Sequence, residues 1–306
     1  MPRPLSPMGA SEANMRGAGF VGRMTESSAV LITGCSSGIG LAAARRLIAG
    51  GFHVYAGVRS ESDGTRIASD LGAACTPIRL DVTSPAEIAA ARAQIDAAGR
   101  GLTGLVNNAG IVVGGPLEAV TIADLRGVLE INVIGLVAVT QAVLPLLRAS
   151  RGRIVNIGSV AGRFASPFMA PYSASKFAVE AISDAARVEL APFGIAVALL
   201  EPGAIDTPIW NKAQADGGVR TARYDGEMRR LYGPIEAAME TIVAGIAKRA
   251  LPAEHVARAI EHALTARRPK ARYVIGNDAR AQLALQMLPS GLRDRMLGYA
   301  LAKATA

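Results

Sequence analysis

The chain has 306 residues, of which 50% are hydrophobic and only 4% aromatic, and its formal net charge is +8. A chain of this length and apolar content can bury a large core and can form one α/β domain. Two cysteines, Cys35 and Cys75, and three scattered histidines, His53, His255 and His262, give neither a disulfide framework nor a metal-ligand cluster. We therefore expect a reduced, cytoplasmic protein without a metal.

Charge and hydropathy also bear on partners. No apolar run reaches the ~18 residues that a bilayer-spanning helix needs, so we expect no integral membrane segment. The basic residues are spread along the chain, with one local cluster at 267–272. No nucleic-acid motif and no interleaved aromatic residues accompany this cluster, which favours a solvated loop over a nucleic-acid site.

The chain begins with residues 1–27, which are rich in Gly, Pro, Ser and Met and have no periodicity, so we expect a disordered tail. Met24 is a candidate functional start, and residues 28–306 are expected to form one domain. Strand-like runs follow at 29–32, 53–58, 76–80, 104–107, 153–157, 195–200 and 272–275, and helical periodicity at 38–49, 84–98, 121–148, 171–191 and 253–266. This alternation predicts a doubly wound, Rossmann-type parallel sheet with helices on both faces.

The first strand runs directly into a glycine turn and a helix. Residues 33–40 read Thr-Gly-Cys-Ser-Ser-Gly-Ile-Gly, with the spacing G-x-x-x-G-x-G instead of the more familiar G-x-G-x-x-G. Gly34 would allow the tight turn, Gly38 the close approach of phosphates, and Gly40 close packing of helix on strand. Backbone N–H groups and a helix N-terminus would then face a pyrophosphate, so the sequence predicts a dinucleotide site.

The end of the second strand indicates which dinucleotide is bound. A chain that selects NAD usually places Asp or Glu there, to bind the ribose 2′-hydroxyl. Here the position is held by Val58 and is followed by Arg59, which can pair with a 2′-phosphate. Ser36 or Ser37 could add a hydroxyl. We expect NADP(H) to be favoured over NAD(H); the alternative is that Arg59 is an ordinary surface arginine.

A tyrosine–lysine pair provides the candidate chemistry. Tyr172 and Lys176 are four residues apart, so a helix places both side chains on one face. An ammonium beside a phenol favours the phenolate and lowers the pKa of the tyrosine. The pair alone is weak evidence, because Tyr and Lys meet at this spacing on many solvated helix faces. Gly34, Asn107 and Ser159, however, each follow a strand run and therefore share the edge where such sheets bind ligands.

Together these motifs resemble the short-chain dehydrogenase/reductase family over roughly residues 28–275. The motifs that carry the resemblance, in the family's order and spacing, are residues 33–40, Asn107-Asn108-Ala109-Gly110, Asn132, Ser159, Tyr172-x-x-x-Lys176 and Pro202-Gly203. Within the family, the first strand and glycine turn, with Val54-Tyr55-Ala56 in the second strand, are most similar to the 17β-hydroxysteroid and retinol dehydrogenases.

The resemblance implies a role for each catalytic residue. Tyr172 would exchange a proton with the substrate oxygen as hydride is transferred, and Ser159 would hydrogen-bond that oxygen. Lys176 would hold the nicotinamide ribose as well as act on the tyrosine. Asn132 would anchor a water molecule and complete a proton relay.

The resemblance also implies further cofactor contacts. Asp81 would bind the adenine amino group, and Asn108, Ala109 and Gly110 would shape the floor near the nicotinamide. The remaining expected contacts lie in the glycine turn and after the sixth strand, and are Ile39, Pro202, Gly203, Ile205 and Thr207. Gly158 departs from the family, because many relatives have a second serine there.

The segment from 208 to about 251 is expected to be the substrate lid. Its residues Met228, Leu231, Ile235, Met239 and Ile242 recur at three- and four-residue steps and form one apolar helical stripe. A lid with adaptable methionines suits a bulky apolar substrate such as a steroid, retinoid or long-chain carbonyl. The alternative is that the stripe simply packs on the domain.

The sequence thus predicts an NADP(H)-dependent oxidoreductase that interconverts an alcohol and a ketone or aldehyde. Relatives pair the helices matching 121–148 and 171–191 between subunits, so the resemblance implies a homodimer or homotetramer. Alternatives are an acyl-carrier or small-carbonyl reductase, a non-catalytic NADPH sensor, and an epimerase or dehydratase. A sensor need not keep Ser159, Tyr172 and Lys176 in register, and an epimerase usually has a different glycine spacing and a longer substrate domain.

Overall fold

The computed structural model describes residues 28–209, 217–218, 221–222 and 224–305; the predicted tail, 1–27, lies outside them. Seven parallel strands form one sheet in the order β3-β2-β1-β4-β5-β6-β9. In chain order these are β1 (Ala29–Ile32), β2 (His53–Val58), β3 (Cys75–Arg79), β4 (Gly104–Asn107), β5 (Arg153–Ile157), β6 (Ala196–Pro202) and β9 (Arg272–Ile275). The strand order reverses between β1 and β4, which is where ligands bind in such sheets.

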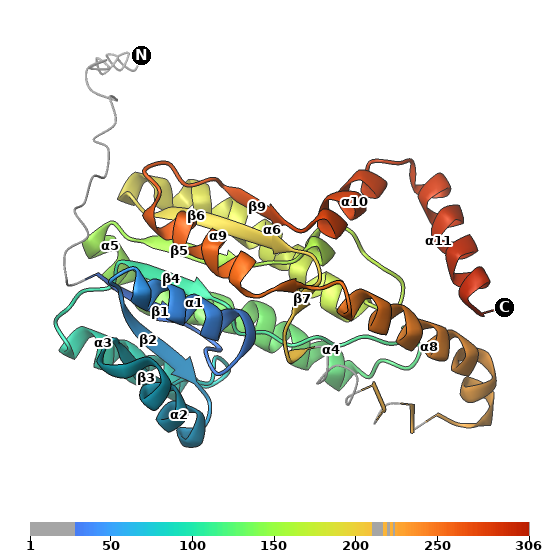
Figure 1. Ribbon diagram of the computed structural model, residues 1–306, viewed down its shortest axis with the longest axis horizontal. Coiled ribbons are helices and arrows are strands. Elements are labelled where there is room, and N and C mark those ends of the chain that lie inside the picture. The colour runs from blue at the N-terminus through green and yellow to red at the C-terminus, as the bar shows by residue number, and fades with distance from the viewer. Residues whose placement is uncertain (1–27, 210–216, 219–220, 223, 306) are drawn as a thin grey trace, which may run out of the picture.

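Helices cover both faces of the sheet (Figure 1). One face carries α1 (Gly38–Ala49), α2 (Glu61–Leu71) and α9 (Glu254–Thr265), and the other carries α3 (Pro85–Ala97), α5 (Gly135–Ser150) and α6 (Ala170–Leu190). The helix α4 (Ile122–Leu129) runs into α5 through a π-helical turn, Glu130–Ile134. The predicted fold class is confirmed.

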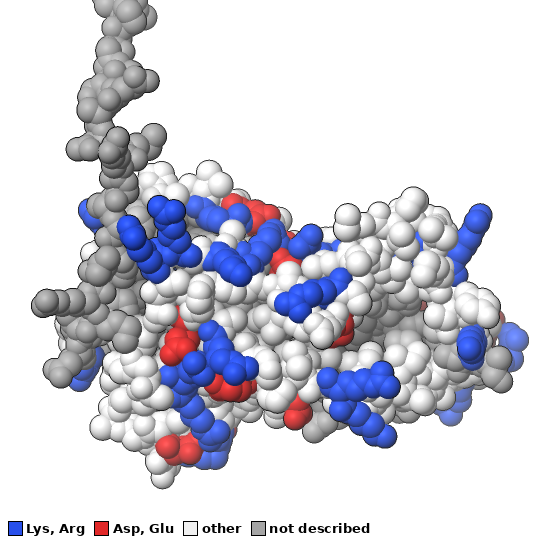
Figure 2. Space-filling view, turned by 45° about the horizontal axis from the view of Figure 1, so that its top comes forward, with Lys and Arg blue, Asp and Glu red and all other residues white. Residues whose placement is uncertain are grey.

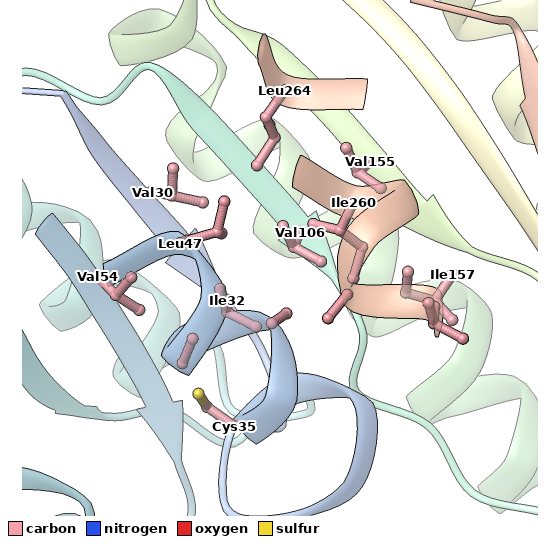
Figure 3. Packing of buried hydrophobic residues seen from close by; sticks show 14 of the residues in the cluster. Val30, Ile32, Cys35, Leu47, Val54, Val106, Val155, Ile157, Ile260 and Leu264 are labelled. Atoms are coloured by element: carbon pink, nitrogen blue, oxygen red, sulfur yellow. The ribbon is translucent and has the colours of Figure 1, made fainter. Parts of the chain in front are cut away.

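The strands are buried on both faces, as parallel strands between two helical layers must be. Val30 and Ile32 pack with α1 and α9, as Figure 3 shows, while Leu31 between them packs on the opposite face. This alternation follows from the two-residue period of a strand. Because aromatic residues are few, aliphatic side chains fill both cores.

All seven strand predictions and all five helix predictions match elements of the structure, with bounds that differ by one or two residues. The helix α2 was missed because its sequence is mostly polar and only Gly64 and Ile67 are buried in it, so few apolar residues mark it. Its beginning is fixed instead by Ser60, whose hydroxyl accepts a hydrogen bond from the Asp63 N–H.

The C-terminal part adds elements that periodicity predicted only in part. The helix α8 (Gly226–Ala247) contains the predicted apolar stripe, and the short strands β7 (Ile205–Asp206) and β8 (Leu251–Pro252) pair beside it. Two unpredicted helices, α10 (Asn277–Gln286) and α11 (Ser290–Thr305), follow β9. In Figure 1 α10 lies next to the end of β9, whereas α11 stands away from the sheet at one end and contacts α8.

One helix is long and apolar enough to cross a membrane by length and composition alone. It is the continuous α4–α5 helix, Ile122–Ser150, whose most apolar 18-residue window has a mean hydropathy of 1.8 and is 33% buried. The sequence shows no uninterrupted apolar run of this length, because the charged residues Asp124, Arg126 and Glu130 lie in the first part of the helix. In this structure Val139 and Val143 pack in the core beneath the sheet, as expected of a core helix.

The surface is basic, in keeping with the net charge: the face in Figure 2 carries more Lys and Arg than Asp and Glu.

Candidate active site

The glycine turn after β1 has the conformation that its sequence predicts. Gly34 and Gly38 have φ angles of +65° and +57°, which side chains other than glycine rarely adopt. A Cβ on Gly34 would lie 2.9 Å from the Ala109 Cα atom, and a Cβ on Gly40 would lie 2.5 Å from the Gly34 carbonyl oxygen. Ser37 is the N-cap of α1, yet its side chain makes no capping hydrogen bond. The N-terminus of α1 therefore keeps N–H groups for an anion, which fits a dinucleotide pyrophosphate.

The turns after β1 and β4 are joined by side-chain hydrogen bonds. The Thr33 hydroxyl accepts from the Asn108 and Ala109 N–H groups, at 3.0 and 2.9 Å. The Asn108 amide in turn donates to the carbonyl oxygens of Thr33 and Gly34, at 2.9 and 3.0 Å. These bonds place Asn108 and Ala109 directly beside the glycine turn, and a Cβ on the adjacent Gly110 would lie 3.2 Å from the Asn132 Oδ1 atom. Thr33 was part of the predicted motif, but its clamping role was not foreseen.

Asn132 lies in the π-helical turn between α4 and α5, and its side chain is buried. Such turns often occur at functional sites. Its amide oxygen accepts from the Ile111 N–H at 2.9 Å, and its amide nitrogen donates to the Ile111 carbonyl at 2.9 Å and to Ser175 Oγ at 3.0 Å. Ser175, which sequence reasoning missed, donates to the Tyr172 carbonyl at 2.7 Å. Asn132 therefore links the segment after β4 to the helix that carries the tyrosine.

The structure brings Ser159, Tyr172 and Lys176 together at the ends of β5 and β6. Ser159 follows β5; its hydroxyl accepts from the Ala161 N–H at 3.1 Å and hydrogen-bonds the Tyr172 side chain. The Lys176 ammonium is buried, donates to the Ile157 carbonyl at 2.8 Å, and lies 5.7 Å from the centroid of the Tyr172 ring. Burial lowers the pKa of Lys176 to about 8.

The electrostatic effect of Lys176 on Tyr172 differs from the prediction. Burial raises the pKa of Tyr172 to about 12, and the hydrogen bond with Ser159 offsets only part of this increase. The ammonium lies against the ring and donates to a backbone carbonyl, so in this arrangement it does not outweigh the loss of solvent around the hydroxyl. The phenol is accordingly protonated at neutral pH, as a proton donor to a carbonyl oxygen must be.

Two arginines flank the adenosine end of the candidate dinucleotide site. Arg59 is exposed at the end of β2, and its charge helps to lower the pKa of Asp81, although a hydrogen bond from the Thr83 N–H is the larger cause. Arg66, on α2, donates to the Ser36 carbonyl at 2.7 Å and pairs with Asp63 at 2.8 Å. Arg66 was missed because α2 was missed; recognising that helix would have placed it beside the glycine turn.

The loop after β6 completes the edge. Thr207 lies against the glycine turn, since a Cβ on Gly38 would be 3.1 Å from the Thr207 Cβ, and Ile205 is buried in β7. The Gly203 N–H donates to the Ile275 carbonyl at 2.9 Å, and the Ala204 N–H donates to Asp278 Oδ2 at 2.7 Å. Asp278, which no motif indicated, thus holds the loop in place from the start of α10. The Ser159 hydroxyl also reaches the Pro202 carbonyl, at 3.4 Å.

Gly158 departs from the family for a packing reason. A Cβ at this position would lie 2.9 Å from both the Leu199 Cδ1 atom and the Leu200 carbonyl oxygen of β6. The close approach of β5 and β6 leaves no room for a serine side chain, and Ser159 keeps its position.

A buried ion cluster supports the same strand ends. Glu201 is fully buried next to Pro202 and pairs with Arg272 at 2.5 Å and with Arg163 at 3.2 Å. Arg272 also pairs with Glu180. The prediction of a solvated basic loop at 267–272 is therefore wrong for Arg272, which begins β9 and neutralises buried carboxylates.

The cysteines and acidic residues offer no second chemistry in the described part of the chain. Cys35 and Cys75 are both free and buried, and burial raises their pKa to about 12 and about 11, so neither is a ready thiolate. Within residues 28–209 and the described segments beyond, no three His, Cys, Asp or Glu side chains are grouped to hold a metal ion.

Comparison with known proteins agrees with this geometry. Residues 28–217 match the short chain dehydrogenase family. The chain therefore belongs to the short-chain dehydrogenases and is an oxidoreductase that acts on CH–OH groups.

Curated relatives place it near the retinol and steroid dehydrogenases. The chain is 37% identical to the NADPH-dependent 3-dehydrocapnine reductase of Ornithobacterium rhinotracheale, covering 90% of this chain and 98% of that protein. It is 37% identical to retinol dehydrogenase 16 of Mus musculus and to 17-beta-hydroxysteroid dehydrogenase type 6 of Bos taurus, in each case over 88% of this chain and 87% of the relative. The predicted branch is thus confirmed.

Solved structures share the fold. A short-chain dehydrogenase from Streptomyces avermitilis superposes with a TM-score of 0.71 at 27% identity, covering 90% of this chain and 97% of that one. A relative from Burkholderia cenocepacia in complex with NADP has a TM-score of 0.68 at 26% identity, over 88% and 97% of the two chains. A relative from Burkholderia phymatum in complex with NAD has a TM-score of 0.73 at 25% identity, over 86% and 94%.

Proposed function

We propose that the protein is an NADP(H)-dependent oxidoreductase that interconverts an apolar ketone or aldehyde and the corresponding alcohol. The observation that carries the proposal is the grouping of Ser159, Tyr172 and Lys176 beside a glycine turn that fits a dinucleotide. A bound nicotinamide dinucleotide supplies or accepts the hydride. The side chains of the protein supply the proton and the hydrogen bonds.

The proton chemistry follows from the pKa values of the site. The protonated Tyr172 phenol donates its proton to the substrate oxygen during reduction, and Ser159 donates a hydrogen bond that stabilises developing negative charge there. Lys176 maintains a positive potential beneath the ring, and Asn132 holds the surrounding segments in register. A proton relay through Asn132 remains a prediction, since its side-chain amide is engaged by Ile111 and Ser175.

The preference for NADP(H) rests on two guanidinium groups and a missing carboxylate. Val58 ends β2 where an NAD-selecting chain has Asp or Glu, and Arg59 follows it. Arg66 lies on the other side, bonded to the Ser36 carbonyl. Both can make charge-assisted hydrogen bonds to a 2′-phosphate. A relative described as NADPH-dependent supports this preference, whereas solved relatives hold NADP or NAD.

The preference for an apolar substrate rests on α8. Met228, Ile235 and Met239 of its apolar stripe are half-buried, while Leu231 and Ile242 remain 45% and 38% exposed. The stripe therefore exceeds what packing on the domain uses. Relatives named for retinol and a hydroxysteroid are consistent with such a substrate.

We also propose a cytoplasmic homodimer or homotetramer. Ile122, Ile134 and Phe177 are exposed by 61%, 52% and 44% on the α4, π-turn and α6 surface, and Val188 is exposed further along α6. A second copy of the chain would remove this apolar area from water. A monomer in light scattering at micromolar concentration would contradict this assembly.

A substrate and cofactor screen tests the function. Purified protein is assayed with ketones, aldehydes and alcohols of graded size and polarity, each with NADP(H) and NAD(H). We expect turnover with NADP(H), greatest for bulky apolar compounds. Acyl-thioester substrates test the acyl-carrier reductase alternative. A folded protein that binds NADPH but turns over none of the compounds would support the sensor alternative instead.

A further inference from the structure

A groove separates α11 from the segment that leads into α6. Its volume is about 390 Å³, and its walls are Ala165, Ser166 and Pro167 on one side and Arg293, Asp294, Leu297, Gly298 and Leu301 on the other. This volume falls within the range of small-molecule sites.

The helix α11 presents two different apolar faces. Leu297 and Leu301 are one turn apart, half-buried, and line the groove. Leu292, Met296 and Tyr299 lie on the opposite side and are 49%, 48% and 72% exposed. The groove face is thus distinct from the outer face of the same helix, which gives matched positions for testing it.

The charges in the groove wall are already paired. Arg293 bonds Asp294 at 3.2 Å through Nε and Gln286 at 2.8 Å through Nη1. The positive charge of Arg293 and the negative charge of Asp294 neutralise each other. Most of the remaining lining is apolar, and comprises Ala165, Pro167, Leu297 and Leu301. Such a wall suits an uncharged hydrocarbon group better than an anion.

The groove wall opposite α11 belongs to the stretch of chain between two of the candidate catalytic residues. Ala165–Pro167 lies in sequence between Ser159 and Tyr172, and the segment is anchored at both of its ends. Phe164 is buried, and the Phe168 carbonyl accepts from the Gly115 N–H at 2.7 Å while Phe168 holds a φ angle of +64°. This segment therefore joins the groove wall to the stretch of chain that carries Ser159 and Tyr172.

We propose that the groove binds the hydrocarbon chain of the substrate distal to the reacting carbon, so that α11 forms part of the substrate site. This inference rests on the proposed oxidoreductase function. It narrows the substrate class to long-chain carbonyl compounds or alcohols and assigns a binding role to a helix that contributes nothing to the catalytic residues.

The test uses methyl ketones of increasing chain length with NADPH. We expect kcat/KM of the wild type to rise by up to about fourfold per methylene once the chain reaches the groove. Gly298→Phe fills the groove at a position where a Cβ meets no atom within 4 Å, so α11 can keep its place. This variant should lose about tenfold or more for the longest ketones, with a loss that diminishes as the chain shortens.

Met296→Phe is the control. Met296 lies on the outer face of the same helix, is 48% exposed, and does not line the groove. The control should keep the chain-length dependence of the wild type. Equal kcat/KM profiles for the two variants would overturn the inference, as would an equal loss of all ketones in Gly298→Phe. A wild type that turns over no carbonyl at all would instead refute the proposed function.

Discussion

The carboxyl edge of the sheet and the C-terminal cover of α8, α10 and α11 are built from different interactions. At the edge, the buried Thr33 and Asn132 side chains and the half-buried Ser159 side chain bond to backbone groups of nearby turns. The cover instead exposes large apolar side chains, including Leu231, Ile242 and Met296. Directional hydrogen bonds fix reacting atoms, whereas apolar contacts tolerate ligands of different shape. We therefore expect the edge to determine the reaction and the cover to determine which substrate is bound.

The largest effect is expected from Tyr172→Phe, which removes the proton donor from the edge. Turnover should fall by about a thousandfold. NADPH affinity should stay nearly unchanged, because we expect the glycine turn and Lys176 to hold the dinucleotide. Steady-state kinetics and fluorescence titration measure the two quantities. Retention of more than about a tenth of the activity, a loss under about 1.4 kcal/mol, would show that another group is the acid.

The second prediction concerns the ions beneath the edge. Arg272→Leu leaves the buried Glu201 and Glu180 carboxylates without their main partner, so the free energy of unfolding should fall by about 3–5 kcal/mol. Arg295→Leu on the cover is the control, and should change it by less than about 0.5 kcal/mol. Urea denaturation measures both variants. Similar losses of unfolding free energy in the two variants would contradict the view that buried ion pairs stabilise the edge but not the cover.

The third prediction is a pH dependence of stability at Lys176. Its folded pKa, about 8, lies below its ordinary value, so between about pH 8 and pH 10 the unfolded chain binds more protons than the folded one. Wild-type stability should therefore rise with pH across this window relative to Lys176→Met, by on the order of 2 kcal/mol. Urea denaturation at several pH values measures the difference. Parallel curves would show that the ammonium is not desolvated.

The fourth prediction distinguishes the roles of Arg59 and Arg66 in cofactor binding. Arg59→Ala should cost about 1.5–3 kcal/mol in NADPH binding and little in NADH binding. Arg66→Ala should weaken NADPH similarly, and should also weaken NADH somewhat because Arg66 braces the Ser36 carbonyl. Calorimetric titration with each cofactor gives the four affinities. Equal losses for NADPH and NADH in Arg59→Ala would show that it does not bind the 2′-phosphate.

Sequence and structure agree at the edge because each motif follows a strand, and parallel strands bring their carboxyl ends together. Gly34, Asn107 and Ser159 could therefore be assigned to one edge of the sheet from the sequence alone. The contacts of Arg66 and Asp278 could not be predicted, because they join residues far apart in sequence and the helices that carry them bury few apolar side chains. The pKa of Tyr172 was mispredicted for a related reason: spacing reveals the nearby lysine but not the burial that outweighs it.

Hydride transfer from NADPH to a carbonyl carbon is the central claim, and isotope transfer tests it most directly. The protein is incubated with an apolar ketone and NADPH deuterated at the reactive nicotinamide carbon, and the alcohol is analysed by mass spectrometry. We predict one deuterium at the former carbonyl carbon, formed by the wild type and formed at least a hundredfold more slowly, to order of magnitude, by Tyr172→Phe. Folded wild-type protein that binds NADPH but forms no labelled alcohol from any ketone would contradict the claim.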